Sequence, residues 1–195
     1  MAWSIKISAM TWGITNPKII TTKYNAEYGA KTLDVKLGEE IGYKFSGSSS
    51  ESLSDKSRLL YITDGLIVAI ILGGDTLLKD YIGVIIDEAH ERKIQIDLLL
   101  YLIKNAIKIR QEQNLKPLKL IIMSATINEK IFAQYYKEFA YDYMFLSGTP
   151  NYPIETIYLE SPLDIKSNKY IEEGKKTVTE IVRKIKRIGL VIINW

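Results

Sequence analysis

Two kinds of apolar pattern alternate along the chain. Nearly continuous apolar runs occupy residues 58–63, 81–86 and 118–123, and short runs of this kind are typical of buried strands. Between the second and third runs, apolar residues recur at helical spacing: Ile96, Leu99, Leu100, Ile103 and Ile107. Pro117 closes the connection before the third run. This part of the chain is therefore predicted to be strand, helix, strand.

The same alternation continues on both sides of this segment. Residues 21–33 have a helical pattern, and a shorter helix is expected before residue 81. Near the end, a strand-like run at 190–194 follows a set of residues at helical spacing: Val178, Ile181, Val182 and Ile185. Apolar strands separated by helices indicate the α/β class, with a mostly parallel sheet covered by helices on both faces. The Ser- and Gly-rich residues 46–55 are expected to form a surface loop with no packing role.

Composition narrows the choice of function only slightly. The chain has 195 residues, of which 47% are hydrophobic, so it can fill a sizeable core. A net charge of +3 permits a polyanionic partner without requiring one, and the absence of cysteine excludes a disulfide framework and a thiolate zinc site. Because no apolar run reaches the ~18 residues of a membrane span, we expect an intracellular protein without a membrane partner.

Candidate chemistry lies at the ends of two predicted strands. Asp87, Glu88 and His90, the only histidine, follow the second apolar run, and residues 124–126 follow the third. Because ligands of such sheets bind beyond the carboxyl ends of the strands, these clusters are expected to be neighbours. Adjacent acids repel each other and need solvent or a cation. An Asp here can hold nucleotide-bound Mg²⁺, usually through water, and a neighbouring Glu can orient or deprotonate the water that attacks phosphorus.

Each of these features also has a purely structural interpretation. An acidic pair after an apolar run is often a solvated loop entrance, and a single histidine is more often a satisfied surface or core group. A Ser-Ala-Thr segment can simply end a strand and cap a helix that starts near Asn128. The Thr-Asp-Gly segment at residues 63–65 can be a helix N-terminus capped by Thr63 or Asp64. Their joint occurrence favours the functional interpretation.

Several short motifs resemble those of one enzyme family. DEAHER at residues 87–92, SAT at 124–126 and TDG at 63–65 resemble motifs of the DEAH-box helicases of superfamily 2. Residues 15–43 are similar to the family's stretch from TQPRR to VKLGEEVGY, and the resemblance spans about residues 15–187. It implies a RecA-like fold and an ATP- and Mg²⁺-dependent helicase, acting on RNA in preference to DNA. The segment YIEEGKK and the Ile-, Lys- and Tyr-rich composition resemble helicases of large DNA viruses, which would place the chain in a virion or the host cytoplasm.

The resemblance also implies roles for residues near the predicted nucleotide site. Asp87 would coordinate Mg²⁺ through water, Glu88 would act on the hydrolytic water, and His90 would couple nucleotide state to motion. The hydroxyls of Ser124 and Thr126 would link the ATP site to the nucleic-acid site, with Ala125 leaving room for that contact.

Further positions match motifs that hold the sugar-phosphate backbone of RNA or DNA single strands and duplexes. They are Thr15, Pro17, Lys18, Thr63, Asp64 and Gly65. Contacts of this type position a strand without reading its bases. Arg92 and Asp97 also match family positions and are expected to be structural partners beside the site.

The sequence departs from the family pattern in ways that bear on activity. The 195 residues contain no G-x-x-x-x-G-K-[ST] phosphate loop, and Lys18 and Ile19 stand where the family has paired arginines, while Asn16 stands where it has glutamine. We therefore expect residues 1–160 to be a partial RecA-like ATP-binding domain without its phosphate loop. Residues 161–195 would begin a truncated second RecA-like domain, so that the fold is incomplete at both ends.

Two functions remain open at this point. One is an ATP-dependent RNA helicase of the DEAH-box type, present as a fragment that needs the phosphate loop and the second RecA-like domain for activity. The other is a non-catalytic remnant or nucleic-acid-binding module without ATPase activity of its own.

Overall fold

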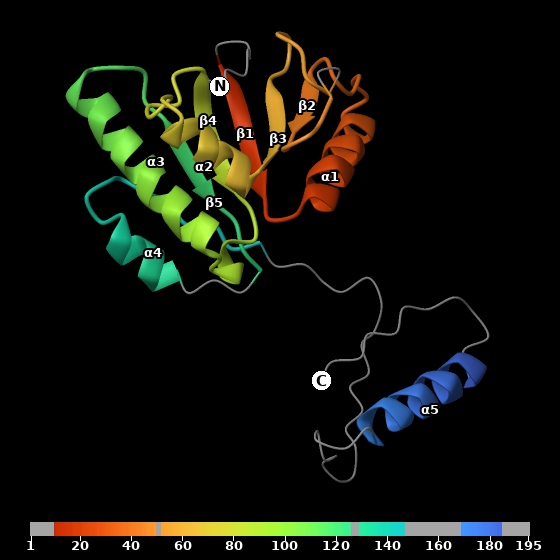
Figure 1. Ribbon diagram of the computed structural model, residues 1–195. Coiled ribbons are helices and arrows are strands. Elements are labelled where there is room, and N and C mark those ends of the chain that lie inside the picture. Colours follow the sequence, from red (N-terminus) through yellow and green to blue (C-terminus); the bar gives the residue numbers. More distant parts are fainter. Residues whose placement is uncertain (1–9, 50–51, 126–128, 147–168, 185–195) are drawn as a thin grey trace. The chain divides into compact units, whose positions relative to one another are not determined.

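The computed structural model describes residues 10–49, 52–125, 129–146 and 169–184 (Figure 1). The chain divides into two compact units, Met1–Asp142 and Tyr143–Trp195, and each is described by itself. The division does not test the predicted domains at residues 1–160 and 161–195, which stay predictions.

The first unit contains a five-stranded sheet in the order β2-β3-β1-β4-β5, in which every neighbouring pair is parallel. Its strands are β1 (Thr11–Asn16), β2 (Ile41–Lys44), β3 (Leu59–Thr63), β4 (Tyr81–Ile86) and β5 (Lys119–Ile122). The three predicted strands correspond to β3, β4 and β5, and the predicted α/β class is confirmed.

The apolar pattern did not predict β1, although β1 lies in the middle of the sheet. Its buried residues are mostly polar or small, since Thr11, Thr15 and Asn16 are almost completely buried. Thr11 donates a hydrogen bond to the carbonyl of Ser57 at 2.8 Å, which satisfies one of these buried groups. β1 is therefore held by pairing on both edges rather than by an apolar run, and periodicity arguments miss such a strand.

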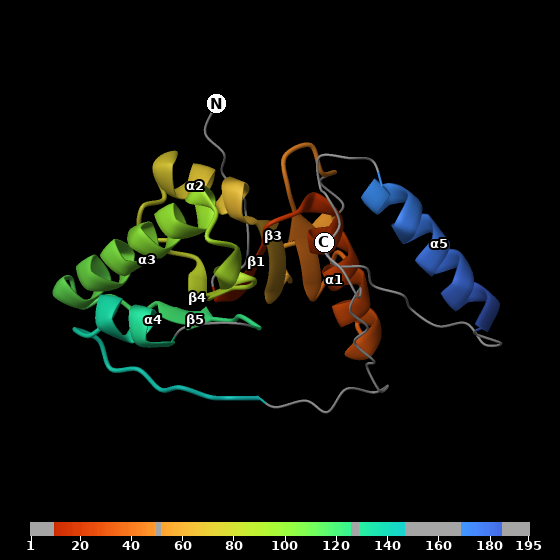
Figure 2. The ribbon, with the colours of Figure 1, turned by 90° about the horizontal axis from the view of Figure 1, so that it is seen from below.

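Helices cover both faces of this sheet (Figures 1 and 2). On β3, Leu60 and Ile62 pack in the core cluster that contains α2 (Asp64–Leu72) and α3 (Ile94–Glu112). The alternating residues of β3, Leu59 and Tyr61, pack with α1 (Ile19–Thr32) on the other face. A short helix, α4 (Glu129–Tyr135), adds Phe132 to the first cluster. None of the described helices is both long and apolar enough to cross a bilayer.

The sequence also led us to expect that both β4 and the run at residues 118–123 would be interior strands. This is correct for β4 but wrong for β5, which lies at the edge of the described sheet. Ile121 and Met123 are 43% and 40% exposed, because no described helix covers that face of β5. An apolar run shows that a strand prefers burial, but it does not specify how many neighbours the strand has.

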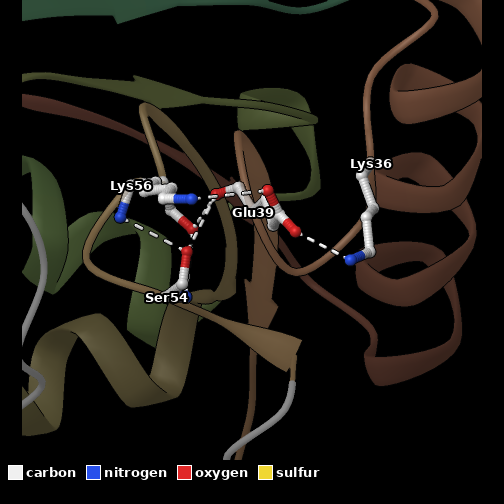
Figure 3. A network of polar contacts seen from close by, with 5 residues as sticks. Lys36, Glu39, Ser54 and Lys56 are labelled. Carbon is white, nitrogen blue, oxygen red and sulfur yellow. Dashed lines mark hydrogen bonds and ion pairs between the residues drawn. The ribbon is translucent and has the colours of Figure 1, made fainter.

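The Ser-rich residues 46–55 do have a packing role, contrary to our expectation. Ser52 is 4% exposed, and Leu53 packs against the main core cluster. Ser54 and Ser57 both donate hydrogen bonds to the backbone carbonyl of Glu39, at 3.2 and 2.7 Å. The Glu39 side chain also pairs with lysines on either side of it (Figure 3). A polar segment can be buried when its hydroxyls satisfy backbone groups, and composition alone does not reveal this.

The second unit contains one described helix, α5 (Lys169–Lys184). It includes the predicted amphipathic position Val178, which is half-buried. The side chains of Ile181 and Val182, residue Ile185 and the strand expected at 190–194 lie outside the described residues.

A buried arginine holds the elements of the first unit together at the amino ends of the strands. Arg110, in the last turn of α3, is 5% exposed. Its guanidinium donates to the carbonyls of Lys116 at 2.7 Å, Leu77 and Leu78 at 3.1 Å, and Tyr81 at 3.3 Å. One side chain thus connects α3, the segment before β4 and the segment before β5, and satisfies carbonyls that are otherwise shielded from water.

We expect Arg110→Met to lower the free energy of unfolding by roughly 2–3 kcal/mol, because it leaves buried carbonyls without a donor. Lys108→Met is the matched control, since it removes the same charge from an exposed position on the same helix. Its effect should stay within about 0.5 kcal/mol. Urea titrations of both variants measure the difference, and equal losses would contradict the role given to Arg110.

Candidate functional site

The carboxyl ends of four parallel strands, β3, β1, β4 and β5, lie side by side at one end of the sheet. Asn16 pairs in register with Thr63, and Ile86 pairs with Thr15 on one side and with Ile122 on the other. The pairing continues past the end of β5, because the amide of Met123 donates to the carbonyl of Ile86 at 2.8 Å. The clusters that begin at Asp87 and Ser124 are therefore neighbours, as the sequence predicted.

The turn after β4 contains two unusual backbone conformations. Glu88 has φ 54° and Arg92 has φ 46°, both in the left-handed region that few non-glycine residues adopt. Between them lies a short 3₁₀ helix, η2 (Ala89–Glu91), whose Ala89 amide donates to the carbonyl of Met123 at 3.1 Å. Left-handed conformations cost about 1–3 kcal/mol each and persist where surrounding contacts enforce them, often at functional sites.

Arg92 and Asp97 form one of the contacts that hold this turn. The guanidinium donates to both carboxylate oxygens of Asp97, at 2.8 and 3.1 Å, in a bidentate pair. Asp97 lies in the first turn of α3, so the pair attaches the end of the turn to that helix. The two residues are structural partners beside the site, as expected.

His90 connects the turn after β4 with the turn after β5. Its Nδ1 lies 3.1 Å from Oγ of Ser124 and 3.4 Å from Oε2 of Glu88. The ring nitrogen can donate to or accept from the serine hydroxyl, depending on the tautomer, and it forms an ion pair with Glu88 when the ring is protonated. The prediction that His90 reaches the Ser-Ala-Thr segment is confirmed.

Asp87 is half-buried, and each of its carboxylate oxygens has one protein donor. Oδ1 accepts from the backbone amide of Glu88 at 2.9 Å, and Oδ2 accepts from the side-chain amide of Asn16 at 3.2 Å. The remaining lone pairs can accept hydrogen bonds from metal-bound waters. Among the described residues, no group of three or more His, Cys, Asp or Glu side chains could hold a metal ion. Mg²⁺ often binds through one or two carboxylates plus waters and substrate phosphates, so Asp87 fits that limited role.

Two of the positions expected to hold a nucleic-acid backbone have buried side chains. Asp64, at the start of α2, is 3% exposed, and Thr15 is completely buried. Desolvation raises the pKa of Asp64, and the nearby Thr15 hydroxyl and the charge of Lys93 oppose that shift. The Thr15 hydroxyl and the Asp64 carboxylate nevertheless form no hydrogen bond of ordinary geometry with each other or with any other described group. A desolvated carboxyl without a hydrogen-bond partner lowers the free energy of unfolding at neutral pH, because its ionised form is disfavoured in the folded chain.

The other expected backbone positions are accessible to different degrees. Lys18 and Gly65 are exposed, whereas Pro17 and Thr63 are partly buried. Lys18 caps the N-terminus of α1, and its carbonyl accepts hydrogen bonds from the Thr21 and Thr22 hydroxyls. Next to Gly65 there is open space, since a Cβ built there meets no atom within 4 Å.

The purely structural interpretations of two motifs are also partly correct. Thr63 is the N-cap of α2, although its side chain forms no capping hydrogen bond. Ser124 follows β5 and is partly buried, Ala125 is exposed, and Thr126 lies outside the described residues. A role in positioning a ligand is compatible with both arrangements.

Similarity to known proteins agrees with this arrangement of motifs. The chain is 39% identical over 182 residues to a protein of Acanthamoeba polyphaga mimivirus named as a candidate ATP-dependent RNA helicase, which covers 93% of this chain and 25% of that protein. It is 38% identical over 181 residues to the ATP-dependent RNA helicase HrpA of Borreliella burgdorferi, covering 93% of this chain and 20% of HrpA. The human ATP-dependent RNA helicase DHX33 is 32% identical to the chain over 170 residues, which cover 86% of this chain and 22% of DHX33. The chain belongs to the DEAH-box helicase family.

The chain spans a quarter or less of the length of these relatives. No family model matches it. The five parallel strands and the helices on both faces agree with the RecA-like fold that DEAH-box membership implies.

Sequence reasoning missed two residues of this DEAH-box site. Asn16 was noted only as a departure from the family's glutamine, yet it contacts Asp87 directly. Lys93 pairs with Glu91, and its charge opposes the rise in the pKa of Asp64 that desolvation causes. Asn16 immediately precedes Pro17, a position expected to contact nucleic acid, and this could have drawn attention to it. Its contact with Asp87, however, depends on β1 lying next to β4.

The raised pKa of Asp64 leads to a prediction about stability. Because the folded chain binds this proton more tightly than the unfolded chain, the free energy of unfolding falls as pH rises above the ordinary value of 3.8. Asp64→Asn removes the ionisable carboxyl, so we expect a higher melting temperature than wild type at neutral pH. The difference should disappear below pH 3.8, where the wild-type carboxyl is protonated in both states.

Asp55→Asn serves as the control, because it makes the same charge change at an exposed position. It should leave the melting temperature nearly unchanged across the same pH range. Thermal unfolding followed by circular dichroism tests both variants, and an Asp64→Asn chain less stable than wild type at neutral pH would contradict the assignment.

Proposed function

We propose that this chain forms part of an ATP-dependent RNA helicase of the DEAH-box type, in superfamily 2, that couples nucleotide hydrolysis to strand unwinding. The observation that carries the proposal is the contact network in the turns that follow β4 and β5. There His90 joins Glu88 to Ser124 across two adjacent strands, next to the half-buried carboxylate of Asp87. Relatives that are similar in sequence over most of this chain are named as ATP-dependent RNA helicases.

In this proposal Asp87 and Glu88 have different roles in hydrolysis. Asp87 would hold Mg²⁺ through water, using the lone pairs left over by its two protein donors. The bound ion would supply charge that stabilises the transferring phosphoryl group. Glu88 is only partly buried, so its carboxylate can orient the attacking water and accept its proton.

His90 and Ser124 would connect hydrolysis to movement. A change in the charge or position of Glu88 acts directly on His90, which is 3.4 Å away. His90 in turn contacts the serine that follows β5, so a shift at the nucleotide side reaches a second strand through one side chain. Ala125 and Thr126 would extend this link toward the nucleic acid.

The nucleic acid would bind along the same edge, beside β1 and β3. Lys18 supplies an exposed positive charge, and the open space at Gly65 allows a sugar-phosphate backbone to approach. Pro17 and Thr63 lie next to these two positions in the chain. Thr15 and Asp64 have buried side chains, so they would support the backbone of these segments from inside the fold instead of contacting the nucleic acid. Such contacts are independent of base sequence.

A second candidate function is a nucleic-acid-binding module without ATPase activity. It is favoured by the absence of a phosphate-loop motif from the 195 residues, because that loop provides most of the contacts to nucleotide phosphates. Similarity to a mimivirus protein favours a viral origin under either proposal. With a viral origin, we propose an intracellular location in a host cytoplasm or a virion.

The 195-residue chain should show no RNA-stimulated ATPase activity above background. Phosphoryl transfer depends on several positioned groups, and loss of an arginine finger alone lowers the rate by roughly 10³ to 10⁵. Phosphate release with and without single-stranded RNA measures this for the chain and for its Glu88→Gln variant. In a longer protein that also carries a phosphate loop and a second RecA-like domain, Asp87→Ala and Glu88→Gln should abolish activity. Turnover by the wild-type chain but not by Glu88→Gln would show that another segment serves as the phosphate loop.

Weak binding of single-stranded RNA should persist in the chain and depend on Lys18. Lys18→Ala is expected to weaken binding to different sequences uniformly and to reduce the salt dependence by about one phosphate contact. Lys23→Ala is the matched control, because Lys23 is also exposed on α1 but lies beside Glu27. Fluorescence anisotropy over a salt series distinguishes the two variants, and equal slopes would argue against a phosphate contact at Lys18.

A further inference from the structure

Asn16 is the last residue of β1, and its side chain is enclosed by the protein at 1% exposure. Its Nδ2 donates to Oδ2 of Asp87 at 3.2 Å, across 71 positions of sequence. Only the amino end of the amide can face a carboxylate, because the carbonyl end would bring two acceptors together. The amide orientation is therefore determined by the chemistry of Asp87.

The sheet register gives this contact a fixed geometry. Thr15 pairs with Ile86, so the next residue of each strand, Asn16 and Asp87, lie side by side at the sheet edge. The other oxygen of Asp87 accepts from the backbone amide of Glu88 at 2.9 Å. With one donor on each oxygen, the plane of the carboxylate is held from two directions.

Packing alone does not explain an asparagine at this position. Its Oδ1 is buried and has no hydrogen-bond partner among the described residues. An unsatisfied buried acceptor reduces stability, and an apolar side chain of similar size would avoid that cost. A buried polar group with an unsatisfied acceptor is typical of positions where function rather than stability determines the residue.

Asn16 also precedes Pro17 and Lys18, the segment proposed to contact the nucleic-acid backbone. The contact therefore joins that segment to the proposed metal-binding carboxylate through a single side chain. We propose that Asn16 is a positioning residue that orients Asp87 for Mg²⁺ binding. This inference rests on the proposed function, specifically on Mg²⁺ binding at Asp87.

The test uses Mn²⁺ alone as a paramagnetic probe, with the ¹⁵N-labelled 195-residue chain. Mn²⁺ bound at Asp87 should broaden the Glu88 backbone amide signal. In Asn16→Ala, we expect about tenfold more Mn²⁺ to be needed for the same broadening, the usual effect of removing a group that orients a metal ligand. Asn16→Gln keeps an amide donor and should respond to lower Mn²⁺ concentrations than Asn16→Ala.

Thr11→Val is the matched control for a loss of buried polar contacts in β1. Thr11 is buried at the opposite end of the same strand and loses a 2.8 Å hydrogen bond to Ser57 on substitution, without contacting Asp87. Its response to Mn²⁺ should equal that of wild type. A reduced response in Thr11→Val as large as that in Asn16→Ala would overturn the inference, since a general loosening of β1 would then account for both.

A second measurement does not require any Asn16 variant to fold. The side-chain NH₂ signals of Asn16 should move in Asp87→Ala, because the carboxylate acceptor is gone. Unchanged signals would overturn the inference, as would equal Mn²⁺ responses of wild type and Asn16→Ala. If Mn²⁺ fails to broaden Glu88 in wild type, the metal site of the proposed function fails as well, so the two failures are distinguishable.

Discussion

The parallel register of β1, β4 and β5 is the constraint on which the rest of the structure depends. It places the carboxyl ends of strands that are far apart in sequence at one sheet edge. Two backbone hydrogen bonds extend it beyond the strands, from Met123 to Ile86 and from Ala89 to Met123. These bonds fix the turn after β4 against the turn after β5, so His90 can reach Ser124 and Asn16 can reach Asp87. A slip of one residue would separate both pairs and turn their side chains to opposite faces.

Several features of this edge reduce stability, and they lie close together. Glu88 and Arg92 adopt left-handed conformations, and Asp64 carries a desolvated carboxyl. The side-chain oxygen of Asn16 has no hydrogen-bond partner among the described residues. At the amino ends of the strands, Arg110 is buried but donates to four carbonyls. These bonds satisfy carbonyls at the amino ends of the strands, although the Tyr81 hydroxyl there is also buried without a partner among the described residues. Strained and unsatisfied groups at the carboxyl ends are expected where that end of the sheet binds ligands.

Prediction from the sequence succeeded where apolar burial controls the structure and failed where polar groups do. The apolar runs gave β3, β4 and β5, and helical spacing gave α3. By contrast, β1 was missed because its buried residues include Thr15 and Asn16, and the Ser-rich loop was misjudged because hydroxyls pair with the carbonyl of Glu39. The edge position of β5 was also missed, because an apolar strand does not specify its number of neighbours.

The sequence by itself determined the class of fold, the motifs and the ends of the strands on which Asp87 and Ser124 lie, because local periodicity and residue chemistry are written in short segments. The tertiary structure decided which of these segments touch. The order β2-β3-β1-β4-β5 inserts β1 beside β4, and this alone brings Asn16 to Asp87. It also decided that the side chains of Thr15 and Asp64 are buried, while Lys18 faces solvent. Strand order and burial arise from contacts between distant parts of the chain, and no short stretch of sequence encodes them.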